Sequence, residues 1–225
     1  RLDPRSAARP PHEVHRDMST SSNLWLSDAP LILASGSTTR RDMLLAAGIP
    51  VEVVKPEIDE RAVEKPLVDR GVPADQVAAA LACAKALSVS RDRPDRFVLA
   101  ADQTLICDDV AFHKPADLAA AERQIASLAG RTHELHSAFV IARDGAPLAD
   151  GLEAARLTMR PLNTDFIARY VAVAGSAALS SVGGYQLEGL GAQLFEKVEG
   201  DHFTILGLPL LAVLSALRDL DCLAR

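Results

Sequence analysis

Asp102 is the residue of this sequence whose type and position point most directly to chemistry. It follows residues 97–101, a continuously apolar run that predicts a strand buried on both faces of a sheet. Open α/β sheets place their ligand sites at the carboxyl ends of such strands, so this carboxylate is a candidate for catalysis or metal binding. An aspartate at a strand end can also cap a turn, and Asp102 alone does not decide between these interpretations.

Glu60 is a second candidate carboxylate, at the end of an acidic stretch that predicts a loop over residues 56–60. Taken alone, a glutamate in such a loop is usually a solvated surface charge. Together, Glu60 and Asp102 would offer Mg²⁺ or Mn²⁺ the oxygen ligands that such cations prefer, alongside the phosphates of a substrate. The pair therefore predicts a site for a divalent metal.

Arg40, Lys85 and Lys114 are the cations that could serve the same site. Lys85 flanks an otherwise apolar helical stripe, and Lys114 precedes a proline that stiffens its loop. Each alone would be an ordinary surface residue. A magnesium nucleoside triphosphate brings roughly −4 from its phosphates and roughly +2 from its metal, which a site must neutralise. Three protein cations suffice, so the set predicts a site for nucleotide phosphates.

Ser35 and Ser37 lie in a polar turn between an apolar run at residues 31–34 and a predicted helix at residues 38–47. Ser37 is placed to cap that helix, and Arg40 follows in its first turn. Backbone N–H groups, hydroxyls and a cation that converge at a helix N-terminus bind phosphate well. The turn therefore predicts one wall of the phosphate site.

The overall composition argues against several classes of protein. A net charge of −6 and an isoelectric point near 5.5 disfavour a nucleic-acid polymer as the main partner, because phosphate backbones require a basic surface. No stretch reaches the roughly 18 consecutive apolar residues of a membrane span. The three cysteines are isolated from one another, which indicates reduced thiols in a cytoplasmic protein rather than a metal or disulfide framework.

Other motifs are weaker. His133 and His136 are three positions apart on a predicted strand, so they face opposite sides and cannot easily chelate one metal. Gly189 and Gly191 lack the third glycine and the strand-to-helix context of a dinucleotide fingerprint. The sequence also lacks the phosphate loop of P-loop NTPases and the nucleophile elbow of serine hydrolases.

Helical and strand patterns alternate along the chain, which predicts an α/β fold with at least one antiparallel ribbon. Asp144 and Gly145 predict a tight hairpin between two long strands. Residues 1–29, rich in Arg, Pro, Ser and Asp, predict a disordered extension in which Met18 is a plausible start, and residues 30–225 predict one domain. The expected helices are 73–90, 117–128, 164–173 and 208–217, and the expected strands are 51–54, 132–142, 148–159 and 192–198, with a hairpin at 105–112.

Several motifs, in one order along the chain, resemble the Maf family of nucleoside triphosphate pyrophosphatases. They are residues 33–45, Asp59 with Glu60, residues 84–86, 99–104, 114–117 and 128–133, the glycine-rich residues 183–189, and residues 199–209. The resemblance spans residues 31–218 and omits the N-terminal extension. Many motifs in one order over one domain make it specific.

The resemblance implies a Maf/inosine-triphosphatase-like α/β fold, an elongated mixed sheet with two lobes flanking a cleft. It implies hydrolysis of a nucleoside triphosphate to the monophosphate and pyrophosphate with a divalent metal, in the cytoplasm, and often as a homodimer. Asp102 falls on the catalytic carboxylate, described as the proton acceptor, and Glu60 and Lys85 fall on further functional positions. Ser35, Arg40 and Lys114 match substrate-binding positions, and we assign Ser37, Gln103 and Glu188 to the same role.

Three departures from the common family pattern bear on the preferred nucleotide. Thr39 stands where an arginine is common, Gln103 where a threonine is common, and Glu188 where a glutamine is common. These changes resemble the branch associated with 7-methyl-GTP rather than the branch that prefers dTTP and UTP. The carboxylate of Glu188 could accept hydrogen bonds from N1–H and the exocyclic amine of guanine, or it could pack in its loop. Tyr185 and Gln186 differ from that branch, so a preference for dTTP or UTP stays open.

Two further interpretations of the function also stay open. The family is linked to septum formation, so the chain could be a non-catalytic regulator that binds a cell-division or nucleic-acid partner. It could also be a nucleotide sensor that binds without turnover. The acidic net charge and the complete set of charged candidates favour the enzyme.

Overall fold

The computed structural model describes residues 24–225. Most of the predicted N-terminal extension, residues 1–23 with Met18, lies outside the described residues. Residues 24–29 pack on the C-terminal tail, because Trp25 forms a β-bridge with Leu223 and its indole Nε1 donates to the Ala29 carbonyl over 3.1 Å. The packed chain therefore includes residues ahead of the predicted boundary at residue 30.

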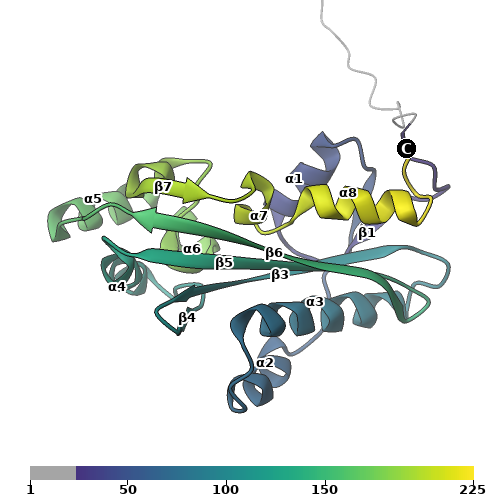
Figure 1. Cartoon of the computed structure of the whole chain (residues 1–225), viewed down its shortest axis with the longest axis horizontal. Helices are drawn as coiled ribbons and strands as arrows, with labels where there is room; N and C mark the ends of the chain where they lie inside the picture. The colour runs from purple at the N-terminus through teal and green to yellow at the C-terminus, as the bar shows by residue number, and fades with distance from the viewer. Residues whose placement is uncertain (1–23) are drawn as a thin grey trace, which may run out of the picture.

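One mixed sheet organises the described chain (Figure 1). Its strands are β1 (Leu31–Leu33), β2 (Val51–Val53), β3 (Val98–Cys107), β4 (Val110–Phe112), β5 (Thr132–Arg143), β6 (Ala146–Met159) and β7 (Phe195–Glu199). Their order is β2-β1-β3-β5-β6-β7, and β4 pairs with β3. β1 is parallel to both of its neighbours, and the other pairs are antiparallel, which confirms the predicted α/β class with an antiparallel ribbon.

Most of the helices pack on this sheet, whereas α2 packs on α3. None of the helices described is long and apolar enough to cross a membrane. They are α1 (Thr38–Ala46), α2 (Glu60–Val68), α3 (Ala74–Ser90), α4 (Leu118–Leu128), α5 (Thr164–Ala174), α6 (Ala177–Ser180), α7 (His202–Ile205) and α8 (Leu210–Asp219), with 3₁₀ turns η1 (Val182–Gly184) and η2 (Leu190–Leu194). Side-chain caps start several of them: Ser37, Asp117 and Asn163 each accept a hydrogen bond from the backbone N–H three residues later.

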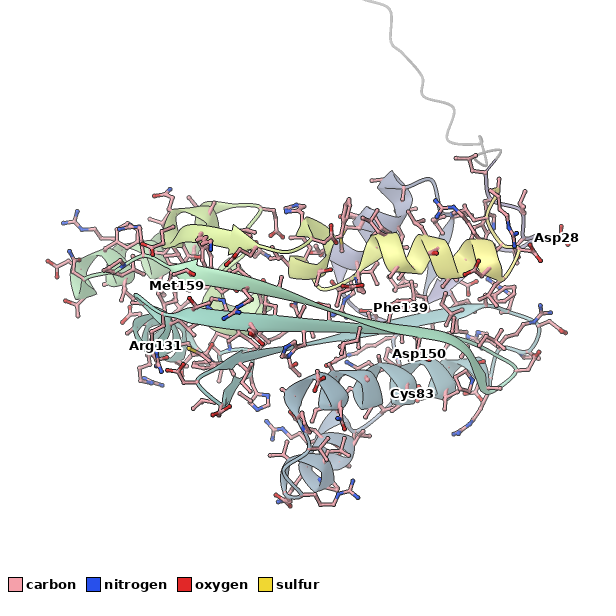
Figure 2. All side chains as sticks on the ribbon, viewed as in Figure 1. Asp28, Cys83, Arg131, Phe139, Asp150 and Met159 are labelled. Atoms are coloured by element: carbon pink, nitrogen blue, oxygen red, sulfur yellow. The ribbon has the colours of Figure 1, made fainter. Side chains whose placement is uncertain are left out.

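The two faces of the sheet carry separate cores, because adjacent strand residues point to opposite faces. On one face, α3 packs against Ile32 and Val98. On the other face, α1 and α8 bury Leu33, Leu99 and Phe139, the last of which is labelled in Figure 2. These two layers make the first lobe.

The long strands β3, β5 and β6 continue from this lobe into a second one (Figure 1). There Leu105, Leu135 and Met159 pack with α4 and α5 in a third core, which Met159 marks in Figure 2. The elongated mixed sheet with two lobes confirms the expected fold.

Both predicted hairpins are present. Asp144 and Gly145, with φ of 53° and 74°, connect β5 to β6, and Asp108 and Asp109, with φ of 47° and 65°, connect β3 to β4. Positive φ at both central residues matches the right-handed twist of the flanking strands. The hairpins therefore set the register of the long strands.

The end of β3 differs from the prediction. The strand continues to Cys107, so Asp102 lies in its middle and not at its carboxyl end. Asp102 pairs with Ala138 of β5, and residues 103 and 104 pair with β5 in turn. The apolar run stops after Ala101 because residues 102–104 line a cleft, not because the strand stops.

The predicted acidic loop also differs, because it ends at Asp59. The side chain of Asp59 accepts a hydrogen bond from the N–H of Ala62 and caps α2, whose first residue is Glu60. α2 buries none of its residues and contains Pro66. Its apolar side is short, with Val63 and Leu67 only half-buried, so the helical signal in the sequence is weak.

Candidate active site

A cleft of about 830 Å³ opens beside the middle of β3. β1 pairs with β3 only at Val98 and Leu99, and β4 pairs with it only from Leu105 to Cys107, so residues 102–104 lie in the gap. The loop after β1 and the loop after β4 form opposite sides of this gap. All nine predicted site residues line the cleft: Ser35, Ser37, Arg40, Glu60, Lys85, Asp102, Gln103, Lys114 and Glu188.

Lys85 connects the two predicted carboxylates. Its ammonium Nζ lies 2.5 Å from Asp102 Oδ1 and 3.1 Å from Glu60 Oε2. The side chains of Lys85 and Asp102 are 9% and 13% exposed, whereas the Glu60 side chain is 54% exposed and lines the cleft. A buried ammonium needs paired charge, so the tertiary structure explains why a lysine interrupts the apolar stripe of α3.

Arg40 is held by backbone carbonyls on two sides. Its Nε donates to Gly207 O and its Nη1 donates to Ala101 O, both over 2.7 Å, and Nη1 also reaches Ser35 Oγ at 3.4 Å. Burial lowers the pKa of Arg40, while the charges of Asp102 and Glu60 act in the opposite direction. Nη2 donates no hydrogen bond within residues 24–225, so it can reach into the cleft.

The Ser35 turn has the form that the sequence predicts. Ser35 is buried, and its Oγ accepts from the N–H of Ser37 over 3.2 Å. Ser37 Oγ accepts from the N–H of Arg40 over 3.3 Å and so caps α1. The N-terminus of α1, with its partial positive charge, therefore lies at the cleft beside the Arg40 guanidinium.

Lys114 approaches the cleft from the other side, on the exposed loop after β4. Its pKa lies below the ordinary lysine value because the surrounding protein partly desolvates the ammonium and because Arg40 and Lys85 repel it. Glu60 and Asp102 oppose this shift. A triphosphate between Lys114 and Arg40 would relieve the repulsion between these cations.

Gln103 and Glu188 occupy different environments. Glu188 is exposed at the cleft, near the end of the glycine-rich residues 183–189. Gln103 faces α7, and its amide nitrogen lies 3.0 Å from Ser137 Oγ and 3.1 Å from the carbonyls of both Thr204 and Ile205.

Tyr185 anchors the glycine-rich segment through contacts with His133 and Phe195. Its hydroxyl lies 2.7 Å from His133 Nε2, and its ring meets Phe195 edge-on at 4.8 Å. Burial lowers the pKa of His133 to about 4 and raises the pKa of Tyr185. His133 is 1% exposed while His136 is partly exposed, which confirms that the two histidines face opposite sides of β5.

Two charged residues of the cleft were not predicted. Lys55, exposed after β2, adds a fourth cation to the lining, and Glu64 adds a carboxylate one turn after Glu60. The spacing of Glu60 and Glu64 places both on one face of a helix, so recognition of α2 would have identified Glu64. Lys55 carries no local signal, because only the fold brings the loop after β2 to the cleft.

The fold and the cleft define an α/β protein whose elongated mixed sheet carries one charged site between two lobes. The sequence model of the Maf-like protein family matches residues 30–220, and the chain belongs to that family.

Known relatives cover nearly the same length. A 7-methyl-GTP pyrophosphatase of Mesorhizobium japonicum is 53% identical over 193 residues, which are 86% of this chain and 97% of the relative. One from Rhizobium etli is 54% identical over 190 residues, 84% of this chain and 96% of the relative. A nucleoside triphosphate pyrophosphatase of Rhodopseudomonas palustris is 50% identical over 202 residues, 89% of this chain and 98% of the relative.

Proposed function

We propose that this protein is a nucleoside triphosphate pyrophosphatase, which hydrolyses a nucleoside triphosphate to the monophosphate and pyrophosphate. The observation that carries the proposal is the cleft itself, where Asp102 and Glu60 share the ammonium of Lys85 and where the side chain of Arg40 also lines the wall. Relatives that are about half identical over nearly their whole length bear names of this activity. A purely non-catalytic regulator would not need this charged constellation.

In this proposal Asp102 orients the attacking water and accepts its proton. The buried Lys85 holds the carboxylate at one position, because the contact of 2.5 Å restricts its rotation. The water attacks the α-phosphate, the bond between the α- and β-phosphates breaks, and pyrophosphate leaves. Arg40 Nη2, Lys114 and the N-terminus of α1 stabilise the charge that develops on the leaving pyrophosphate.

The carboxylates of the cleft fit a divalent cation. Glu60 and Asp102 are two oxygen donors at the cleft, and each lies within 3.1 Å of the Lys85 ammonium. This fits Mg²⁺ or Mn²⁺, which bind one or two carboxylates plus substrate phosphates. Such a cation would supply charge neutralisation for the phosphates.

We propose 7-methyl-GTP as the preferred substrate. Glu188 is exposed at the cleft, where its carboxylate can accept two hydrogen bonds from the Watson–Crick edge of a guanine. The relatives named for 7-methyl-GTP support this preference. The competing substrates are dTTP and UTP.

We further propose a cytoplasmic homodimer. Cys83, Cys107 and Cys222 are free thiols in the described chain, as expected in a reducing compartment. Light scattering of the purified protein tests the dimer, because a mass near 23.9 kDa would contradict it.

A substrate panel tests the reaction and the preference together. The protein is incubated with 7-methyl-GTP, GTP, dTTP and UTP in the presence of Mg²⁺ or Mn²⁺, and the products are separated by ion exchange. Pyrophosphate and the monophosphate are the expected products, whereas orthophosphate as the first product would refute the reaction. A clear lead of dTTP or UTP would leave the reaction standing and refute the preference.

A further inference from the structure

We infer that Phe112 is a specificity-determining residue, whose ring stacks on the base of the nucleotide and favours the positively charged base of 7-methyl-GTP over that of GTP. This inference rests on the proposed function and deepens it, because it assigns recognition of the methylated base to one side chain. Phe112 lies between two of the family motifs, residues 99–104 and 114–117, and belongs to neither.

The cleft has a charged part and an apolar part. In the charged part, Asp102 and Glu60 meet at the Lys85 ammonium. In the apolar part, four half-buried side chains of the second lobe line the cleft and pack against the third core; they are Phe112, Leu179, Val182 and Leu187. A nucleotide has the same division, with charged phosphates at one end and a flat base at the other. Small-molecule sites typically combine apolar walls with a few polar groups, so the apolar part fits the base.

Phe112 is the aromatic ring of this wall that is available to a ligand. Two benzene-type rings line the cleft within residues 24–225, those of Phe112 and Tyr185. Tyr185 is 4% exposed, its hydroxyl bonds to His133, and its ring meets Phe195 edge-on. Phe112 is only half-buried, and its ring has no aromatic partner in the described part of the chain.

The backbone places Phe112 next to both the phosphate cations and the glycine-rich segment. Phe112 pairs with Leu105, and directly opposed residues of an antiparallel pair project to the same face of a sheet. The glycine-rich segment lies against that face, because a Cβ on Gly183 would come within 2.7 Å of the Leu105 side chain. Lys114 follows two residues later, at most roughly 7 Å along the chain. A base on Phe112 therefore lies beside the segment that carries Glu188, while its phosphates can reach Lys114.

The chemistry of the base makes an aromatic ring selective. Methylation of N7 gives the guanine ring a positive charge that unmethylated guanine lacks. The face of a benzene ring is negative and attracts a cation that lies within about 6 Å of its centroid. The ring also stacks on an uncharged base, but with less energy. Glu188 acts differently, because the N1–H and exocyclic amine that it would contact are present in both GTP and 7-methyl-GTP.

The Phe112→Leu variant tests this inference, because leucine keeps an apolar contact and removes the aromatic face. In steady-state kinetics, the ratio of kcat/KM for 7-methyl-GTP to kcat/KM for GTP should fall about three- to tenfold relative to wild type. Phe112→Tyr keeps the ring and should retain the wild-type ratio within about twofold. An unchanged ratio in Phe112→Leu, or an equal fall in Phe112→Tyr, would overturn the inference.

Phe166→Leu is the matched control. Phe166 is also half-buried against the third core, but it lies outside the cleft, where the Arg160 guanidinium sits 4.3 Å from the centre of its ring. Both substitutions remove a ring from the same core, so the melting temperature should fall in both variants, whereas the ratio should fall only in Phe112→Leu. If Phe112→Leu does not fold, Phe112→Met replaces it with the same expected ratio. An equal fall of the ratio in Phe166→Leu would overturn the inference.

A binding measurement separates this inference from the proposed function, because calorimetry with 7-methyl-GMP and GMP needs no turnover. Wild type and Phe166→Leu should bind 7-methyl-GMP at least about threefold more tightly than GMP, and Phe112→Leu should lose this difference. If this pattern is found without release of pyrophosphate from a triphosphate, the proposed function fails and the inference stands. Equal affinities of the wild type for the two monophosphates, or binding of neither, would overturn the inference and leave the proposed reaction standing.

Discussion

The ammonium of Lys85 on α3 lies 2.5 Å from the carboxylate of Asp102 on β3, below the open cleft. Their side chains are 9% and 13% exposed, so this ion pair is largely removed from water. An exposed ion pair contributes little, whereas a buried one fixes its partners because neither charge can leave without loss of solvation. The pair therefore gives the proposed base a defined position before substrate arrives.

The Asp102→Asn variant should lower kcat roughly 10²- to 10⁴-fold, because the amide cannot accept the proton of the attacking water. Asparagine keeps the shape and its oxygen can still accept from Lys85, but the buried ammonium keeps only Glu60 as a charged partner, so the melting temperature should also fall. Pyrophosphate release and thermal unfolding measure the two effects. Asp109→Asn, in the exposed turn of the same hairpin, is the control. A fully active Asp102→Asn would remove this residue from the mechanism.

The Glu60→Gln variant should raise the metal concentration that gives half-maximal activity at least about tenfold, since a proposed oxygen ligand loses its charge. Activity is measured over a Mn²⁺ or Mg²⁺ titration at saturating nucleotide. Glu57→Gln, in the exposed loop before α2 and outside the cleft lining, should behave as wild type. Identical titration curves for Glu60→Gln and wild type would exclude Glu60 as a metal ligand.

Lys114 should control the alkaline limb of the pH profile. Desolvation and repulsion by Arg40 and Lys85 lower its pKa, so Lys114 loses its charge at a lower pH than an ordinary lysine. KM should therefore rise once the pH exceeds this lowered pKa. Lys114→Arg should move this rise to higher pH, because arginine stays charged. Lys65→Arg, on the exposed side of α2, is the control. A rise of KM at the same pH in both variants would assign it to another group.

The Glu188→Gln variant should reduce the preference for 7-methyl-GTP and GTP over UTP and dTTP roughly tenfold, because the amide cannot accept both hydrogen bonds from the guanine edge. The ratio of kcat/KM values between nucleotides is the measurement. Glu196→Gln, exposed on β7, is the matched control. An unchanged ratio would show that Glu188 packs in its loop without reading the base.

His133 should make the folded state sensitive to acid. Its folded pKa of about 4 lies below the ordinary 6.5, so the unfolded state binds more protons between these values. The contribution of His133 to the free energy of unfolding is then fully present above pH 6.5. It is lost as the pH drops toward 4, which lowers the free energy of unfolding by up to about 3 kcal/mol. His133→Phe should flatten this slope in urea unfolding at several pH values. His202→Phe, exposed on α7, should keep the slope, and an unchanged slope in His133→Phe would contradict the assignment.

Local signals in the sequence were sufficient for the fold class and for the candidates Asp102, Glu60 and Arg40, whereas Gln103 and Glu188 came with the family resemblance. Lys55 and Glu64 were missed. The apolar runs before Ser35 and Asp102, the cap at Ser37 and the turn at Asp144 and Gly145 each act over a few residues, so they can be read without the fold. The helix that begins at Glu60 could not be read, because α2 buries nothing and carries Pro66. The end of β3 was predicted too early, because a sequence changes from apolar to polar residues both where a strand ends and where a strand lines a cleft.

By itself the sequence determined that this is an α/β protein of the Maf type and named nine residues of its cleft. Only the tertiary structure decided what those residues do to one another. It buried Lys85 between two carboxylates, placed Gln103 against α7 and turned Arg40 onto the Gly207 carbonyl. The physical reason is that a buried charge or amide needs partners, and here those partners come from elements far apart in the chain.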